Sequence, residues 1–124
     1  MTVADAQKHL SSALTTIADP TSTKVRLDSA TEPAHMEAAY YTREAHLSIV
    51  GEGIPAPAPG HVYRVWLLGA SGNQALGDFR PDDGLVVLNL VVNVTRFSRL
   101  VITEERAGPA GRGPAGIKRW ATGL

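Results

Sequence analysis

A predicted strand over residues 63–68 constrains the fold of this chain more than any other segment. A Pro-rich loop leads into it, and its side chains are almost all apolar or aromatic. One face carries Tyr63, Val65 and Leu67. The other face carries Trp66, because successive side chains of a strand point to opposite sides. A strand with so few polar positions is typically central in its sheet and covered on both sides.

Further short apolar segments, separated by turn signals, predict an all-β chain. Clusters of Gly, Ser, Asn, Asp and Pro at 69–73 and 81–84 are typical turns. The predicted strands are residues 23–27, 35–41, 45–50, 63–68, 75–79, 85–92, 100–104 and 117–120. Seven or eight such strands favour a two-layer antiparallel β-sandwich, and a Trp in a central strand suits an immunoglobulin-like core.

The first part of the chain predicts a short amphipathic helix. Apolar residues recur at three- and four-residue spacing between residues 4 and 18, in one narrow stripe. Pro20 ends the pattern, since the residue before a proline avoids the helical region. So short a helix is marginal in water and must pack on something or fray. We therefore expect a short N-terminal helix within residues 1–18 and a β-sandwich domain over residues 19–124.

The segment 107–116 consists mostly of Gly, Pro and Ala. It is expected to be a mobile loop, or a loop ordered by what it packs against. The basic residues around it are Arg106, Arg112, Lys118 and Arg119. A solvated loop and edge strand explain these charges better than a phosphate or nucleic-acid site. Trp120 is the single aromatic residue nearby, and one aromatic side chain is a weak platform for stacking bases.

Composition excludes several classes of function. The 124 residues fit one domain, and twelve basic residues balance twelve acidic ones, so no nucleic-acid partner is indicated. The absence of cysteine excludes disulfides, thiolate catalysis and thiolate zinc sites. The sequence contains no run of about 18 apolar residues, the length that a membrane-spanning helix needs. The N-terminus lacks the features of a signal peptide, so an exported form would need a preceding segment.

The histidines do not form a recognisable metal motif. His35 and His46 would face each other if their strands pair as a hairpin, whereas His9 and His61 lie far away in the sequence. A metal site needs three or four convergent ligands with supporting hydrogen bonds. We therefore expect no metal and no cofactor.

No catalytic motif stands out either. Ser71 lacks the G-x-S-x-G spacing of a nucleophile turn and is expected in a hairpin turn. Asp82 and Asp83 fit turn chemistry, with too few oxygen ligands around them for calcium. Glu104 and Glu105 are neighbours on a strand and should point in opposite directions. We therefore predict no catalytic residue and no enzymatic activity.

Several motifs resemble, in order, the extracytoplasmic domain of the anti-sigma-K factor (RskA-like) family. The similarity covers about residues 19–116. Its parts are the opening strand at 19–27, G-L-P at 53–55, Y-x-L-W-L at 63–67, G-x-F-x-x-dG at 76–84 and the closing T-x-E-P-x-G-G-S-x-x-P-T-G at 102–116. The chain departs from the closing motif, with Glu105 in place of its proline and Ala115 in place of its last threonine.

The resemblance implies a non-enzymatic sensor domain outside the cell membrane. One transmembrane helix would join it to a cytoplasmic zinc-binding module that grips a sigma factor, and neither segment lies in this chain. Residues 1–18 would be the juxtamembrane connector, and membrane proteases would release the sigma factor by regulated proteolysis. The alternative is a free-standing β-sandwich that binds a small ligand or carbohydrate.

Overall fold

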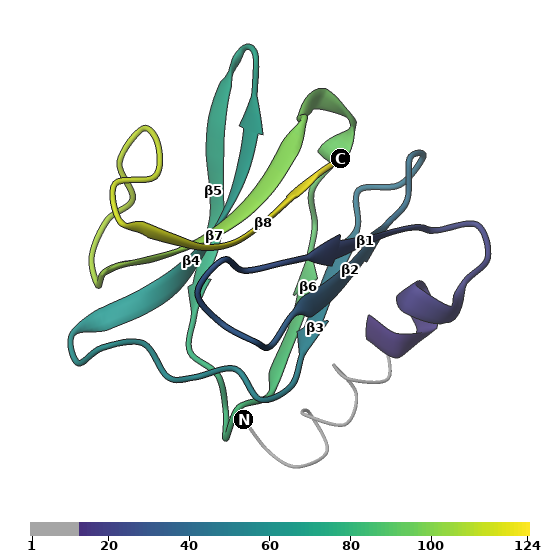
Figure 1. The fold of residues 1–124 in the computed structure, drawn as a ribbon. Coiled ribbons are helices and arrows are strands. Elements are labelled where there is room, and N and C mark those ends of the chain that lie inside the picture. The colour runs from purple at the N-terminus through teal and green to yellow at the C-terminus, as the bar shows by residue number, and fades with distance from the viewer. Residues whose placement is uncertain (1–12) are drawn as a thin grey trace.

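The computed structural model describes residues 13–124, which form two four-stranded antiparallel sheets packed face to face (Figure 1). Sheet A has the order β1-β2-β3-β6 and sheet B the order β5-β4-β7-β8. The strands are β1 (Thr23–Leu27), β2 (Met36–Tyr40), β3 (Leu47–Gly51), β4 (His61–Gly69), β5 (Gly72–Phe79), β6 (Val86–Leu90), β7 (Arg99–Arg106) and β8 (Ile117–Gly123), and the 3-10 turn η1 (Val94–Arg96) lies between β6 and β7. The predicted two-layer antiparallel sandwich is confirmed.

The predicted central strand lies inside sheet B. β4 pairs with β5 on one side and with β7 on the other. The β4–β5 hairpin turns through Ala70 and Ser71, because Gly69 and Gly72 are already a cross-strand pair. Gly72 has φ 142°, which a residue with a side chain rarely adopts. This tight turn lets β5 begin at residue 72, three residues before its predicted start.

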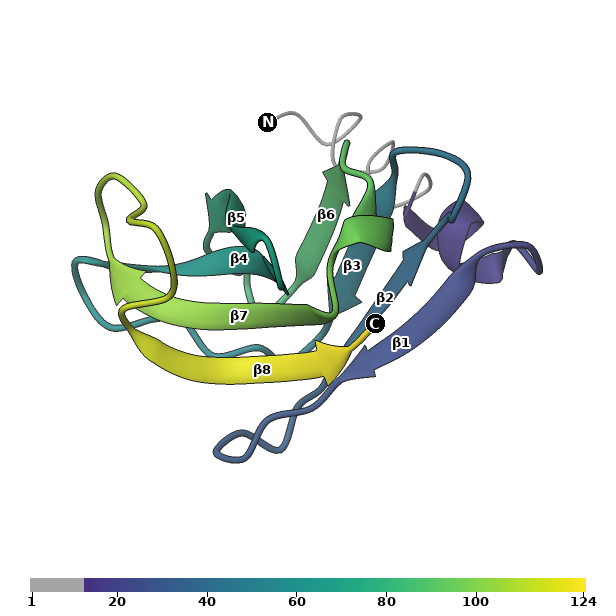
Figure 2. The same cartoon turned by 90° about the horizontal axis from the view of Figure 1, so that it is seen from above.

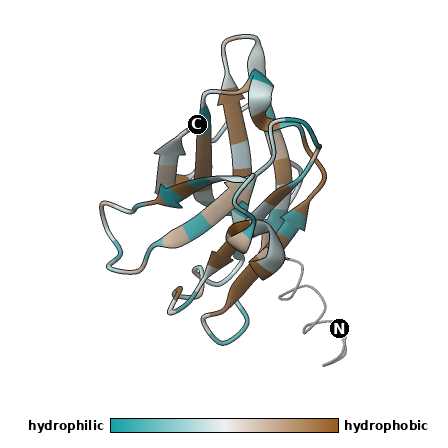
Figure 3. Ribbon diagram, turned by 90° about the vertical axis from the view of Figure 1, so that its right-hand side faces the viewer, coloured by the Kyte–Doolittle hydropathy of each residue, from teal (hydrophilic) through white to brown (hydrophobic). Residues whose placement is uncertain are grey.

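The core between the sheets is built on the face of β4 that carries Tyr63, Val65 and Leu67. Each of these side chains is at most 2% exposed. Trp120 of β8 is the tryptophan of this core, where its ring meets the ring of Tyr63 edge-on at 5.3 Å. Figure 3 shows the apolar residues concentrated on the strands.

Trp66 is fully buried, as predicted, but on the opposite face of sheet B. The Trp expected in an immunoglobulin-like core is therefore outside the inter-sheet core, and Trp120 occupies that core instead. Trp66 Nε1 donates to Glu105, whose other carboxylate oxygen accepts from Ala115 in the segment 107–116 that connects β7 to β8.

The two sheets meet along one side of the sandwich. Figure 2 shows β8 running beside β1. Asp28 and Ala121 exchange two backbone hydrogen bonds there, of 3.3 and 3.1 Å. β8 continues to residue 123, beyond the predicted 120, and its last part forms this seam.

Residues 13–18 are helical and lie against the outer face of sheet A (Figures 1 and 2). The helix ends before Asp19, as the following proline predicts. Residues 4–12 of the predicted helix lie outside the described residues. The division into a connector over 1–18 and a domain over 19–124 stays a prediction.

Candidate functional sites

The end of the N-terminal helix is held by a chain of polar contacts, here called the connector seat: Thr16, His46, Ser48 and Asn89. Thr16 Oγ1 lies 3.0 Å from His46 Nε2, and His46 Nε2 lies 2.9 Å from Ser48 Oγ. Ser48 Oγ donates to Asn89 Oδ1 at 2.8 Å. The seat therefore joins the helix to β3 and β6, two strands of sheet A.

Small side chains let the helix approach the sheet closely. Ala39 and Ser48 are directly opposite each other on β2 and β3, and both are fully buried. On the helix, Ala13 is also fully buried and Thr16 is 4% exposed. Ser22 Oγ donates to the Thr16 carbonyl oxygen at 2.7 Å, so a helix-end carbonyl has a partner. The helix end is thus packed as well as hydrogen-bonded.

The turn after the helix is fixed by Asp19. Its carboxylate accepts hydrogen bonds from the Tyr41 hydroxyl at 2.6 Å and from the Thr21 amide at 2.8 Å. Lys24 Nζ donates to the Asp19 carbonyl oxygen at 2.6 Å. The Tyr41 hydrogen bond is the main reason that the pKa of Asp19 is lowered, and the same bond raises the pKa of Tyr41. Each bond favours the ionised carboxylate and the neutral phenol.

A second polar cluster lies under the β7–β8 loop, residues 107–116, here called the strap. Arg64, 3% exposed, projects from β4 and donates to both carboxylate oxygens of Asp78, at 2.6 and 2.9 Å. Arg64 Nη2 also donates to the Gly108 carbonyl oxygen of the strap at 2.6 Å. The hydrogen bonds to Asp78 raise the pKa of Arg64, so the guanidinium stays charged. One buried cation thus ties β5 to the strap.

Glu105 completes the cluster. Its Oε2 accepts a hydrogen bond from Trp66 Nε1 at 2.8 Å and a short one from Thr103 Oγ1. Its Oε1 accepts from the Ala115 amide at 3.4 Å and lies 3.6 Å from Arg64 Nη1. Gly108 and Ala115 of the strap therefore both contact this buried polar cluster.

Close packing fixes the end of the strap. A Cβ atom at Gly116 would overlap the Glu104 carbonyl oxygen and lie 2.7 Å from Glu105 Cγ. Only a residue without a side chain fits this close approach of two backbones. The glycine that ends the family's closing motif has this structural role here.

The prediction that His35 and His46 would face each other is wrong, although their strands do pair. The β2–β3 register joins Met36 to Gly51 and Tyr40 to Leu47, which places the two histidines at opposite ends of the hairpin. His35 Nε2 lies 3.9 Å from Glu37 Oε1, and His61 Nδ1 lies 3.1 Å from the carbonyl oxygen of residue 59. His9 lies outside the described residues. Within residues 13–124, no three His, Asp or Glu side chains gather as a metal site requires.

The remaining sequence candidates have structural places. Ser71 lies in the β4–β5 turn, and Asp82 exchanges backbone hydrogen bonds with Leu85 in the next turn. Glu104 pairs with Arg119 at 3.0 Å while Glu105 binds Trp66 on the other face. The two glutamates point in opposite directions, as predicted.

Sequence reasoning missed the Arg64 cluster. The signal was present, because Arg64 is the single charged residue in an otherwise apolar central strand and shares a face with Trp66. A buried charge needs a partner, and that requirement predicts an acidic residue nearby without saying which one. The neighbours Asp78 and Glu105 follow only from the strand pairing.

In the part of the chain that the structure describes, no helix has the length and apolar character to cross a bilayer. The profile of one protein family, described as anti-sigma-K factor rskA, C-terminal, matches residues 2–116. No curated protein and no solved structure shows significant similarity to the chain.

Proposed function

The chain belongs to the family of C-terminal domains of anti-sigma-K factors, and on that premise we propose that it is the extracytoplasmic sensor of a membrane-anchored anti-sigma factor. The family is one of transcription regulators rather than enzymes. Under this proposal a cytoplasmic module elsewhere in the protein binds the sigma factor, and a transmembrane helix outside this chain anchors the regulator. The present domain controls regulated proteolysis by controlling access to the connector, residues 1–18.

The connector seat is the observation that supports this proposal. A protease binds its substrate as an extended backbone, so a helix packed on a domain must leave its seat before it is cut. Ala13 and Thr16 are buried against sheet A, and Thr16 is joined to His46. A seated connector is therefore a poor substrate, and an unseated one is a good substrate.

The seat is built to open without unfolding the sandwich. It consists of hydrogen bonds, each worth about 1 kcal/mol, rather than of large apolar side chains. Local opening of such a unit costs less than global unfolding. A signal that weakens the seat would raise the cleavable fraction while the two sheets stay intact.

The test is connector cleavage in the full-length anchored regulator. Thr16→Val and His46→Leu remove the contact between helix and sheet and should each raise the cleaved fraction about fivefold, the equivalent of one lost hydrogen bond. His61→Leu is the matched control, because His61 is a half-exposed histidine on sheet B, away from the helix. Melting temperatures of the isolated chain separate loss of the seat from loss of the fold. Equal cleavage in all three variants, with the fold retained, would remove support for the sensor and favour the ligand-binding alternative.

A further inference from the structure

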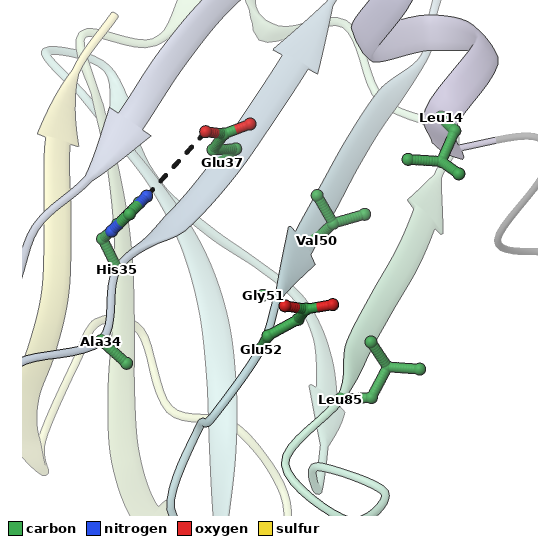
Figure 4. A pocket seen from close by; sticks show the side chains of 8 residues that line it. All are labelled: Leu14, Ala34, His35, Glu37, Val50, Gly51, Glu52 and Leu85. Carbon is green, nitrogen blue, oxygen red and sulfur yellow. Dashed lines mark ion pairs between the residues drawn. The ribbon is translucent and has the colours of Figure 1, made fainter.

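A hollow of about 440 Å³ lies on the outer face of sheet A beside the connector helix (Figure 4). Leu14 of the helix, Val50 of β3 and Leu85, next to β6, provide its apolar wall. Figure 4 shows these three side chains around one side of the hollow, with Glu52 next to them and His35 and Glu37 across from them. Two separate parts of the fold, helix and sheet, thus share one site.

The apolar wall is unusually exposed for this molecule. Leu14 is 50% exposed and Leu85 is 40% exposed. Among the described residues four large apolar side chains are exposed, and two of the four line this hollow. Single exposed apolar residues need no explanation, but apolar residues gathered at a concave site mark a binding surface.

The charges around the hollow select the occupant. Among the described residues its lining contains two carboxylates, Glu37 and Glu52, and one imidazole, His35, whose Nε2 lies 3.9 Å from Glu37 Oε1, but no Lys or Arg. Arg26 is opposite Glu37 in the β1–β2 register, but its Nε donates to Asp28 at 2.7 Å. Carboxylates beside an apolar wall favour a cationic partner and disfavour an anionic lipid surface.

We propose that the hollow binds a short peptide segment in which a Leu-sized apolar side chain stands next to a Lys or Arg. The apolar side chain contacts Leu14, Val50 and Leu85, and the cation pairs with Glu52 or Glu37. The occupant bridges helix and sheet, because Leu14 comes from the connector and the other residues come from the sandwich.

One consequence rests on the proposed function. A ligand that binds only the seated helix stabilises that state by mass action. The peptide therefore keeps the connector uncleaved, and its loss is the signal. The hollow is then the input site of the sensor.

The binding test is an NMR titration of the full chain with acetyl-Leu-Lys-Leu-amide, with acetyl-Leu-Glu-Leu-amide as the charge-reversed control. The basic peptide should shift the methyl signals of Leu14, Val50 and Leu85, and the acidic one should not. Glu37→Gln and Glu52→Gln should each weaken binding about two- to fivefold, as for exposed charge pairs. Glu44→Gln, an exposed carboxylate at the other end of the β2–β3 hairpin, is the matched control.

Equal shifts with both peptides, or none with either, would overturn the proposal. Binding that appears only after removal of residues 1–12 would also overturn it, because the chain's own segment would then be the occupant. Cleavage of the connector in the presence of the basic peptide tests the binding site and the proposed sensor function separately. Binding without slower cleavage keeps the site and refutes the sensor function, whereas slower cleavage supports both.

Discussion

Glu105 is the residue whose loss best tests the account of the strap. Its carboxylate is 7% exposed and accepts hydrogen bonds from Trp66 and Thr103, beside the Arg64 guanidinium at 3.6 Å. Glu105→Ala removes all of these contacts and leaves a small cavity under the strap.

The structure sets the size of the effect. Removing one member of a buried ion pair costs about 3–5 kcal/mol when the other charge is left unpaired. Arg64 is not left unpaired, because it keeps Asp78 and Gly108, and Trp66 Nε1 keeps Thr103 Oγ1 at 3.1 Å. Hydrogen bonds to a charged group are worth about 1.5–3 kcal/mol, so we expect a loss of about 2–3 kcal/mol. The melting temperature should fall by about 8–12 °C for a domain of this size.

Urea unfolding followed by tryptophan fluorescence measures this loss, and hydrogen exchange locates it. The strap amide of Ala115 should exchange much faster in Glu105→Ala. The core amides around Trp120 should exchange faster only by the factor that corresponds to the lower free energy of global unfolding. Glu105→Gln keeps an acceptor of the same shape and should cost about 1 kcal/mol. A free energy of unfolding for Glu105→Ala within about 0.5 kcal/mol of the value for the natural chain would refute the reasoning.

Three further predictions follow from other contacts. Tyr41→Phe removes the main cause of the lowered pKa of Asp19, so that pKa should rise towards its ordinary value of 3.8 in a carbon-detected NMR titration. Because the folded-state pKa of Asp19 is depressed, its contribution to stability is present above the unfolded pKa and is lost as the pH falls through the folded value, and Tyr41→Phe should shrink that acid-side loss. Trp66→Ala should cost about 3–5 kcal/mol in urea unfolding, from lost transfer energy and a cavity, and a cost below about 1 kcal/mol would contradict the full burial of the indole. Gly116→Ala should destabilise the chain by about 1–3 kcal/mol through overlap with the Glu104 carbonyl, and a neutral result would contradict the close approach described for the strap.

The arrangement of strands could be predicted because it depends on local patterns. Short apolar or alternating segments between turn signals located the strands, and the turn at Asp82 and Asp83 was recognisable from its composition. Asp83 indeed has φ 51°, a conformation that Asp tolerates in turns. Strand ends were less predictable, because β5 and β8 extend through pairing with β4 and β7 rather than through their own residues.

The candidate sites were beyond local reasoning. Burial of Trp66 followed from its strand, but its partner Glu105, which also accepts from Ala115 of the strap, lies 39 residues later in the chain, and only the tertiary fold brings them together. The same holds for Thr16 and His46, which are thirty residues apart. The separation of His35 and His46 also depends on strand register, because a hairpin can place two residues opposite each other or at its two ends.

The central claim is that this domain controls the release of a sigma factor by controlling access to the connector. The most direct measurement is sigma-dependent reporter output from the full-length anchored regulator, with and without residues 19–124, under resting and stressed conditions. The account predicts higher resting output and a lost stress response when the domain is removed, because the connector has no seat. Unchanged output in both conditions would contradict it.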